Sequence, residues 1–93
     1  MIIRIATEGQ YELTGAALAR LDEIDNELLA AISANDAQAY QERFRDVLEL
    51  IRKEGRPLAA GELRESDLVL PPPDTTLEEA KALFAEYPAD LPR

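Results

Sequence analysis

The segment that constrains the backbone most is residues 66–79, SDLVLPPPDTTLEE. Its apolar run over 68–70 favours a short β-strand, which the three prolines end because proline lacks the N–H that a β-ladder needs. Thr75 and Thr76 each precede a glutamate by three residues, a spacing typical of a helix capping box. The segment therefore predicts a strand over 68–70 and a helix over about 76–86.

The amino-terminal residues alternate apolar and polar side chains in two short runs, over about 2–6 and 10–13. The turn between the runs ends in Gly9, which can adopt a positive φ, so the pattern predicts a β-hairpin. An isolated hairpin is only marginally stable in water. We therefore expect the strand at 68–70 to join it as a third strand and helices to cover it.

The next stretch has apolar residues at the helical period, which predicts a helix over about 15–33 with Thr14 as its N-cap. Its apolar positions, at spacings of three, four and three, are Leu21, Ile24, Leu28 and Ala31.

A second helix is predicted over about 37–54, beginning after Asp36, whose carboxylate can cap free backbone amides. Gly55 is expected to end it in a left-handed conformation. Its apolar face consists of Tyr40, Phe44, Val47, Leu48 and Ile51. Because only a few residues join the two helices, they must lie antiparallel with these faces together. The expected fold class is α+β.

A length of 93 residues, 46% of them hydrophobic, is suited to one globular domain. We assign residues 1–87 to this domain and expect residues 88–93 to form a frayed tail, since they show no periodicity. The amino terminus lacks the features of a secretory signal, and no apolar run approaches the length of a membrane span. A cytoplasmic location is therefore expected. The outer edge of the hairpin could pair with a second copy to form a homo-oligomer.

The charge of the chain narrows the classes of partner. Nineteen acids and ten bases leave a net charge of −9, which repels phosphate backbones and anionic lipid headgroups. Binding to nucleic acid or directly to a membrane is therefore not expected. The acid excess lies late in the chain, at Glu62, Glu65, Asp67, Asp74, Glu78, Glu79, Glu86 and Asp90. A partner with a basic surface would complement it, although an acidic face also serves solubility.

No residue pattern predicts catalysis, and we do not expect an enzyme or a cofactor. Glu78 and Glu79 are paired carboxylates, but acids in a first helical turn favour the helix dipole. The chain has no cysteine or histidine to bind zinc. A cluster of acids in the first helix is expected on its solvated outer face: Asp22, Glu23, Asp25 and Glu27. Three aromatic residues could line a ligand pocket, although their spacing fits core packing better: Tyr11, Tyr40 and Phe44.

Several of these motifs occur together, and in the same order, in a known family. The opening MIIRI, then EGQY at 8–11, the acidic helix around 21–26 and SDLVLPPPD at 66–74 followed by TLEE resemble the PspA-associated domain, PspAA. This resemblance spans nearly the whole chain. It implies a small companion of PspA, the membrane-remodelling coiled-coil protein of the phage-shock envelope-stress response, and it carries no catalytic residues.

The resemblance and the charge lead to one hypothesis: an adaptor that docks on a PspA-type protein, tunes its assembly or membrane engagement, and reaches the inner face of the membrane only through that partner. The alternative is a small-molecule or signal-sensing domain with a pocket between hairpin and helices. For partner docking we select the segment whose prolines hold it extended. Its residues are Asp67, Pro71, Pro72, Pro73 and Asp74. A simple connector from strand to helix is the other interpretation of this segment.

Overall fold

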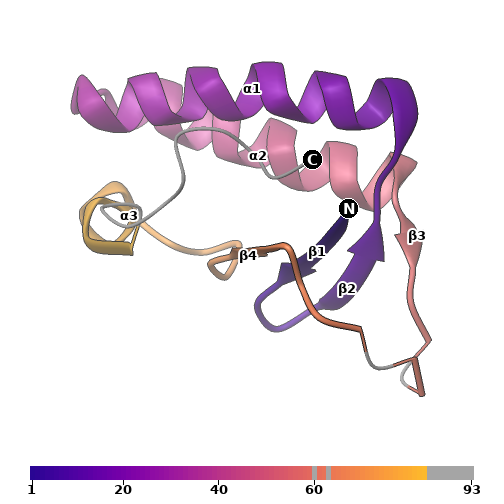
Figure 1. Ribbon diagram of the computed structural model, residues 1–93. Helices are drawn as coiled ribbons and strands as arrows, with labels where there is room; N and C mark the ends of the chain where they lie inside the picture. Colours follow the sequence, from indigo (N-terminus) through magenta and orange to yellow (C-terminus); the bar gives the residue numbers. More distant parts are fainter. Residues whose placement is uncertain (60, 63, 84–93) are drawn as a thin grey trace.

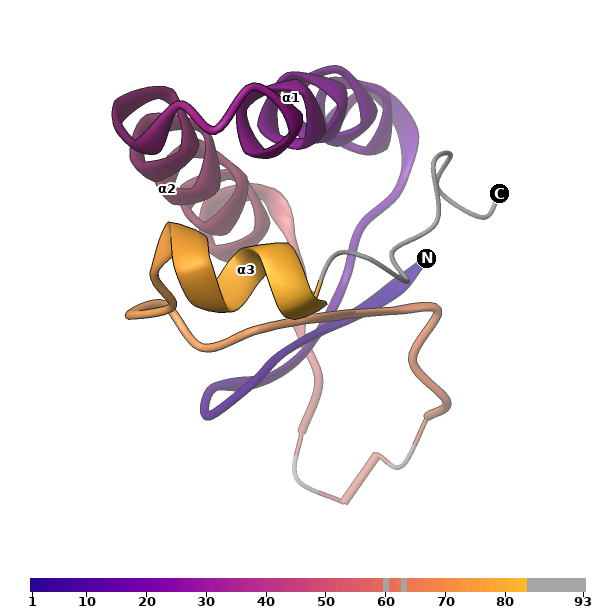
Figure 2. The same ribbon diagram turned by 90° about the vertical axis from the view of Figure 1, so that its left-hand side faces the viewer.

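A layer of helices lies over a β-sheet in the computed structural model of the chain, which describes residues 1–59, 61–62 and 64–83 (Figure 1). The helical layer is an antiparallel pair, α1 (Gly15–Ser33) and α2 (Ala37–Glu54). A short helix, α3 (Leu77–Leu83), contacts both of them (Figure 2). The strands are β1 (Ile2–Ile5), β2 (Gly9–Glu12), β3 (Arg56–Pro57) and β4 (Leu68–Leu70).

The predicted α+β class is confirmed, as are the hairpin, both long helices, the third strand and a final helix. The final helix was predicted to reach residue 86, and its last three positions lie outside the described residues. The predicted tail over 88–93 also lies outside them. None of the helices in the described part of the chain is long and apolar enough to span a membrane.

The strands form a mixed sheet in the order β3-β2-β1-β4. β1 pairs antiparallel with β2 and parallel with β4, and Arg4 lies opposite Val69 in the parallel pair. Both strands of the hairpin have a further neighbour, β3 beside β2 and β4 beside β1, so the edges of the sheet are those of β3 and β4. Pro57 is tolerated in β3 because this strand is at the edge of the sheet.

Gly55 does not end α2 as predicted. Its φ of −78° and ψ of 149° are extended rather than left-handed, because the chain passes directly from α2 into β3. The position nevertheless requires a small residue. A Cβ atom at Gly55 would lie 2.4 Å from the carbonyl oxygen of Ile51 and 3.1 Å from the Cβ of Tyr11.

The helix caps agree with the sequence at two of three positions. Asp36 Oδ1 accepts a hydrogen bond from the Ala39 N–H at 3.1 Å, which confirms the cap of α2. Thr76 and Glu79 form the predicted capping box, with reciprocal bonds of 3.1 and 3.3 Å. Thr14 occupies the N-cap position of α1, but its side chain makes no capping hydrogen bond.

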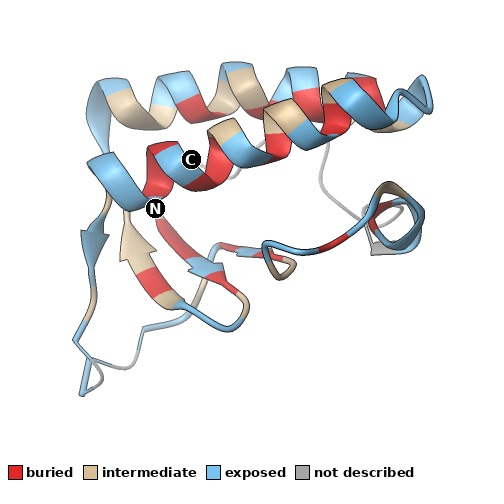
Figure 3. Ribbon diagram, turned by 180° about the vertical axis from the view of Figure 1, so that it is seen from behind, coloured by how far each residue is buried: buried red, intermediate tan, exposed pale blue. Residues whose placement is uncertain are grey.

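The core lies between the helical layer and the sheet (Figure 3). Ile3 and Ile5 of β1 and Ile51 of α2 are 0% exposed, whereas Arg4 and Val69 of the sheet are exposed. Ala80 brings α3 into the same core. The sheet therefore buries one face under the helices.

Asp25 departs fully from the expectation that the acids of α1 are solvated, and Asp22 departs in part because it is half-buried. Asp25 is 1% exposed and lies in the buried row of the helix with Leu21 and Leu28. It follows Leu21 by four positions, so the helical period places it on the inner face even though its charge suggested the outer one. Glu23 and Glu27 are exposed as expected.

Candidate functional site

Asp67, the first of the predicted docking residues, holds two strands together. Its Oδ2 accepts a hydrogen bond from the Ile2 N–H at 2.8 Å, and its own N–H donates to the Ile2 carbonyl oxygen at 2.8 Å. Both contacts place the start of β4 beside β1. The structure therefore uses this carboxylate in joining the sheet.

The prolines carry the chain from β4 into α3. Pro71 and Pro72 are half-buried, and the Pro72 carbonyl accepts a hydrogen bond from the Thr75 N–H at 3.0 Å, which closes a turn. Pro73 and Asp74 are exposed on this turn. The five selected residues thus divide into two groups, with Asp67 before β4 and the prolines and Asp74 after it.

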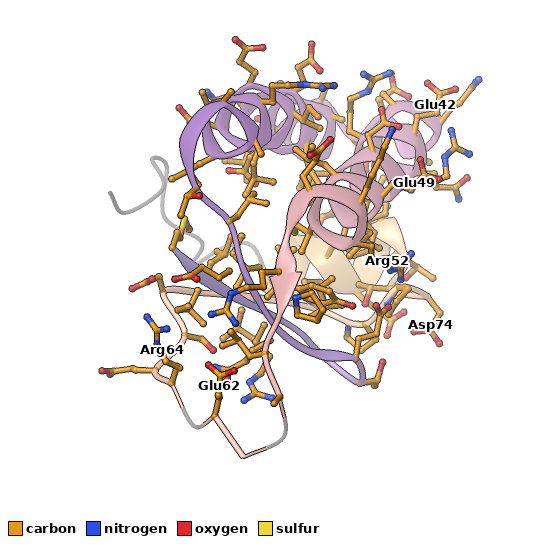
Figure 4. The ribbon with its side chains drawn as sticks, turned by 90° about the vertical axis from the view of Figure 1, so that its right-hand side faces the viewer. Glu42, Glu49, Arg52, Glu62, Arg64 and Asp74 are labelled. Carbon is orange, nitrogen blue, oxygen red and sulfur yellow. The ribbon has the colours of Figure 1, made fainter. Side chains whose placement is uncertain are left out.

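Pro73 and Asp74 line a groove of about 390 Å³ between their turn and α2. The groove residues of α2 are Tyr40, Gln41, Phe44, Arg45, Leu48 and Arg52, and the opposite wall is Pro73, Asp74, Thr75 and Thr76. Figure 4 shows Arg52 and Asp74 on the same side of the molecule. We call this feature the α2–proline groove.

The floor of the α2–proline groove is held rigidly. Tyr40 and Phe44 stack with their ring centroids 5.6 Å apart and their planes 19° apart. The Tyr40 hydroxyl donates a hydrogen bond of 2.8 Å to the Thr75 carbonyl oxygen, which fixes the proline turn to α2. Burial, with the negative charge of Glu79 as a second cause, raises the pKa of Tyr40 to about 12. The hydroxyl is therefore a neutral donor at physiological pH.

The α2 wall of the groove is cationic. Arg52 pairs with Glu8 of the β1–β2 turn, with Nε to Oε1 at 2.9 Å and a second contact between Nη2 and Oε2. This pairing lowers the pKa of Glu8 and raises that of Arg52. Arg45 is exposed and forms no ion pair with the residues that the structure describes. Asp74 opposes these two arginines from the other wall.

Two further hollows are less suited to a partner. One, of about 470 Å³, follows the seam of α1 and α2, where Arg43 pairs with Glu27 and Asp46 at 3.4 Å each. Its lining holds three basic and three acidic side chains, so it carries no net charge that would attract a charged partner. The other, of about 370 Å³, lies beside Gln10, whose side chain donates hydrogen bonds to the Arg64 carbonyl and the Ser66 hydroxyl. Those bonds hold Arg64 and Ser66, which lie between β3 and β4, beside β2.

The sequence did not identify Arg45 and Arg52 as site residues. Neither arginine belongs to the apolar face from which the second helix was predicted. The signal that was missed is their spacing from Leu48, which Arg45 precedes by three positions and Arg52 follows by four. The three aromatics considered as a pocket separate: Tyr40 and Phe44 meet, and Tyr11 lies on β2.

Within the described ranges, His, Cys, Asp and Glu side chains do not gather in groups of three that could hold a metal ion. No curated protein and no solved structure matches the chain. The family model described as "PspA-Associated protein" matches residues 1–90, nearly the full length. The chain therefore belongs to the PspA-associated protein family.

Proposed function

We propose that this protein is a non-catalytic adaptor that binds a PspA-type membrane-remodelling protein and regulates its assembly or membrane engagement in the envelope-stress response. The observation that carries the proposal is the family match over residues 1–90, whose description is an association with PspA. A rigid groove beside the proline turn offers a surface for such a partner.

The net charge supports an indirect route to the membrane. A charge of −9 repels the anionic lipids of a cytoplasmic leaflet. A partner that itself binds lipid would bring the adaptor to the membrane. The location that we propose is therefore the cytoplasm and, through the partner, the inner face of the membrane.

The sensing alternative is less well supported. It requires a pocket between the hairpin and the helices, and core side chains occupy that space, among them Ile3, Ile5 and Ile51 at 0% exposure. A ligand there would have to displace packed aliphatic groups, which costs stability. We therefore favour the adaptor.

Binding to the partner is the first test. Purified protein and the PspA-type protein of the same organism are mixed at micromolar concentration in low salt and analysed by size-exclusion chromatography. The adaptor is expected to elute with the partner, whereas an unrelated acidic protein of similar size and charge elutes alone. If the two proteins elute separately at every ratio tested, the proposal is wrong.

Vesicle flotation tests the indirect route. The adaptor is incubated with anionic liposomes, with and without the PspA-type protein, and centrifuged in a density gradient. It is expected to float only in the sample with the partner. Flotation of the adaptor alone would contradict the electrostatic argument and show that this protein itself binds lipid.

A further inference from the structure

We infer that the α2–proline groove seats an amphipathic helix of the partner, which places an acidic side chain against Arg45 and a basic side chain against Asp74. This inference rests on the proposed function and identifies the chemistry of the docking partner. It differs from the expectation of a purely basic partner, because the groove has one cationic and one anionic wall.

The backbone of the groove walls favours a helix over an extended peptide, because both backbone groups of Thr75 and of Thr76 are already bonded. A peptide that binds as a strand needs free N–H and C=O groups beside it. The amide N–H and carbonyl of Thr75 are already bonded to Pro72 and Tyr40, the Thr76 N–H is bonded to Glu79, and Pro73 has no N–H. A helix satisfies its own backbone groups and needs only side-chain contacts.

The charges of the groove determine how such a helix is oriented. Arg52 is paired with Glu8, so Arg45 is the cation of the α2 wall that can accept a new acidic partner. Asp74 stands on the opposite wall and is exposed. A helix with acids on one side of its apolar face and bases on the other complements both walls in only one direction. Opposed charges of this kind set orientation and association rate.

The apolar contribution comes from a small, rigid floor. Tyr40, Phe44 and Leu48 are 1%, 3% and 4% exposed, so the partner covers little new apolar surface. The hydrogen bond from Tyr40 to Thr75 keeps the two walls in place before binding, which reduces the entropy lost on association. Binding is therefore expected to depend strongly on the wall charges and on salt.

Charge reversal on each wall tests the inference. Affinity for the PspA-type protein of the same organism is measured by isothermal titration calorimetry for the wild type, Arg45→Glu and Asp74→Lys. Matched controls are Lys53→Glu, on α2 outside this groove, and Glu23→Lys, on the exposed side of α1. Each groove variant is expected to bind about tenfold more weakly at low salt, because reversal replaces attraction by repulsion. The controls should stay within about twofold of the wild type, since distant charges are screened.

The outcomes separate this inference from the proposed function. Loss of affinity in both groove variants, with unchanged circular dichroism and intact controls, supports the groove. If all four variants bind the partner as tightly as the wild type does, the groove is not the docking site, and the proposed adaptor function is unaffected. Absence of wild-type binding overturns both. Sedimentation of the adaptor alone gives the remaining outcome: a dimer that Arg45→Glu dissociates would assign the groove to a second copy and overturn the inference.

Discussion

At the scale of single residues, Gly55 is required for space rather than for backbone conformation. Its φ of −78° suits any residue, but an added Cβ would approach the Ile51 carbonyl oxygen to 2.4 Å. That oxygen belongs to the last turn of α2 and accepts the Gly55 N–H, so it cannot move without breaking a bond. We expect Gly55→Ala to lower the free energy of unfolding by about 1 to 3 kcal/mol, measured by urea denaturation.

The matched control for this prediction is Gly61→Ala. A Cβ at Gly61 meets no heavy atom of the described residues within 4 Å, and the residue is exposed. Its substitution should change the free energy of unfolding by less than about 0.5 kcal/mol. Equal effects at the two positions would show that the close approach at Gly55 does not determine its identity.

The raised pKa of Tyr40 leads to a prediction of how the free energy of unfolding changes with pH in the alkaline range. Its pKa is raised from 10.0 to about 12 because burial disfavours the charged phenolate. Between these values the unfolded chain has released the proton and the folded chain has kept it, so stability falls as pH rises. The wild type should lose stability between about pH 10 and 12 more steeply than Tyr40→Phe, in urea titrations at each pH.

Removal of the Tyr40 hydroxyl has a second consequence at neutral pH. The Thr75 carbonyl would lose its donor at 2.8 Å in a buried position, which costs about 1 to 3 kcal/mol. Tyr40→Phe is thus expected to be less stable than the wild type at pH 7. Parallel pH curves for the two proteins would contradict the raised pKa.

At the scale of elements, the N-caps of the two long helices should respond differently to the same substitution. Asp36 caps α2 through a bond of 3.1 Å to Ala39, whereas Thr14 makes no such bond at α1. Asp36→Ala is expected to lower the free energy of unfolding by about 1 kcal/mol. Thr14→Ala should lower it by less than about 0.5 kcal/mol, and a larger loss there would mean that its hydroxyl does cap α1 in solution.

Asp67 should matter for the sheet and not for the partner. Asp67→Ala removes the acceptor of the Ile2 N–H, a bond to a charged group worth about 1.5 to 3 kcal/mol. Hydrogen exchange of the Ile2 amide should accelerate in this variant, while Glu65→Ala, at an exposed position two residues earlier, leaves it unchanged. If Asp67→Ala loses partner binding while the Ile2 amide exchanges no faster than in the wild type, Asp67 contributes to docking rather than to the sheet.

The elements that could be predicted from sequence are those with local signals. The period of α1 and α2, the Asp36 cap and the threonine–glutamate capping box depend on residues within a few positions of one another. β3 could not be predicted, because Pro57 favours a turn and its pairing with Tyr11 depends on tertiary structure. The parallel direction of the pairing of β4 with β1 could not be predicted either, because it also depends on tertiary structure.

The candidate site was predicted only in part for a similar reason. The proline turn is encoded locally, and Pro73 and Asp74 do lie on a groove. Its other wall comes from α2, which is brought there by the packing of Tyr40 on Thr75. For Asp25 the local signal was present but was not followed. Its charge led to the prediction of an exposed position, whereas the helical period places it on the inner face, where it is buried.

At the scale of the whole molecule, the ion pair of Glu8 and Arg52 joins the sheet to the helical layer. Arg52 lowers the pKa of Glu8, so the pair stabilises the fold above about pH 4.5 and loses its effect as pH falls below that value. Arg52→Gln is expected to cost less than about 1 kcal/mol at pH 7, because the pair is partly solvated. The difference in free energy of unfolding between Arg52→Gln and the wild type should become smaller below about pH 4.5.

Arg45→Gln is the matched control, since Arg45 forms no ion pair within the described residues. The free energy of unfolding of Arg45→Gln should differ little from that of the wild type, and by the same amount at pH 7 and below about pH 4.5. Thermal unfolding followed by circular dichroism measures all three proteins. A difference for Arg52→Gln that stays constant from pH 7 into acid would contradict the assignment of the pair to Glu8.

The parallel pairing of β4 with β1 also sets the order in which the chain can assemble on the ribosome. The hydrogen bond from Ile2 to Asp67 joins residues 65 positions apart, so the first strand to be synthesised gains its second neighbour late. Until then the edge of β1 that later pairs with β4, where the Ile2 carbonyl and the Ala6 N–H are exposed, is open to pairing with other chains. Such distant contacts slow folding. A nascent chain of this protein is therefore most prone to aggregation before residue 70 emerges.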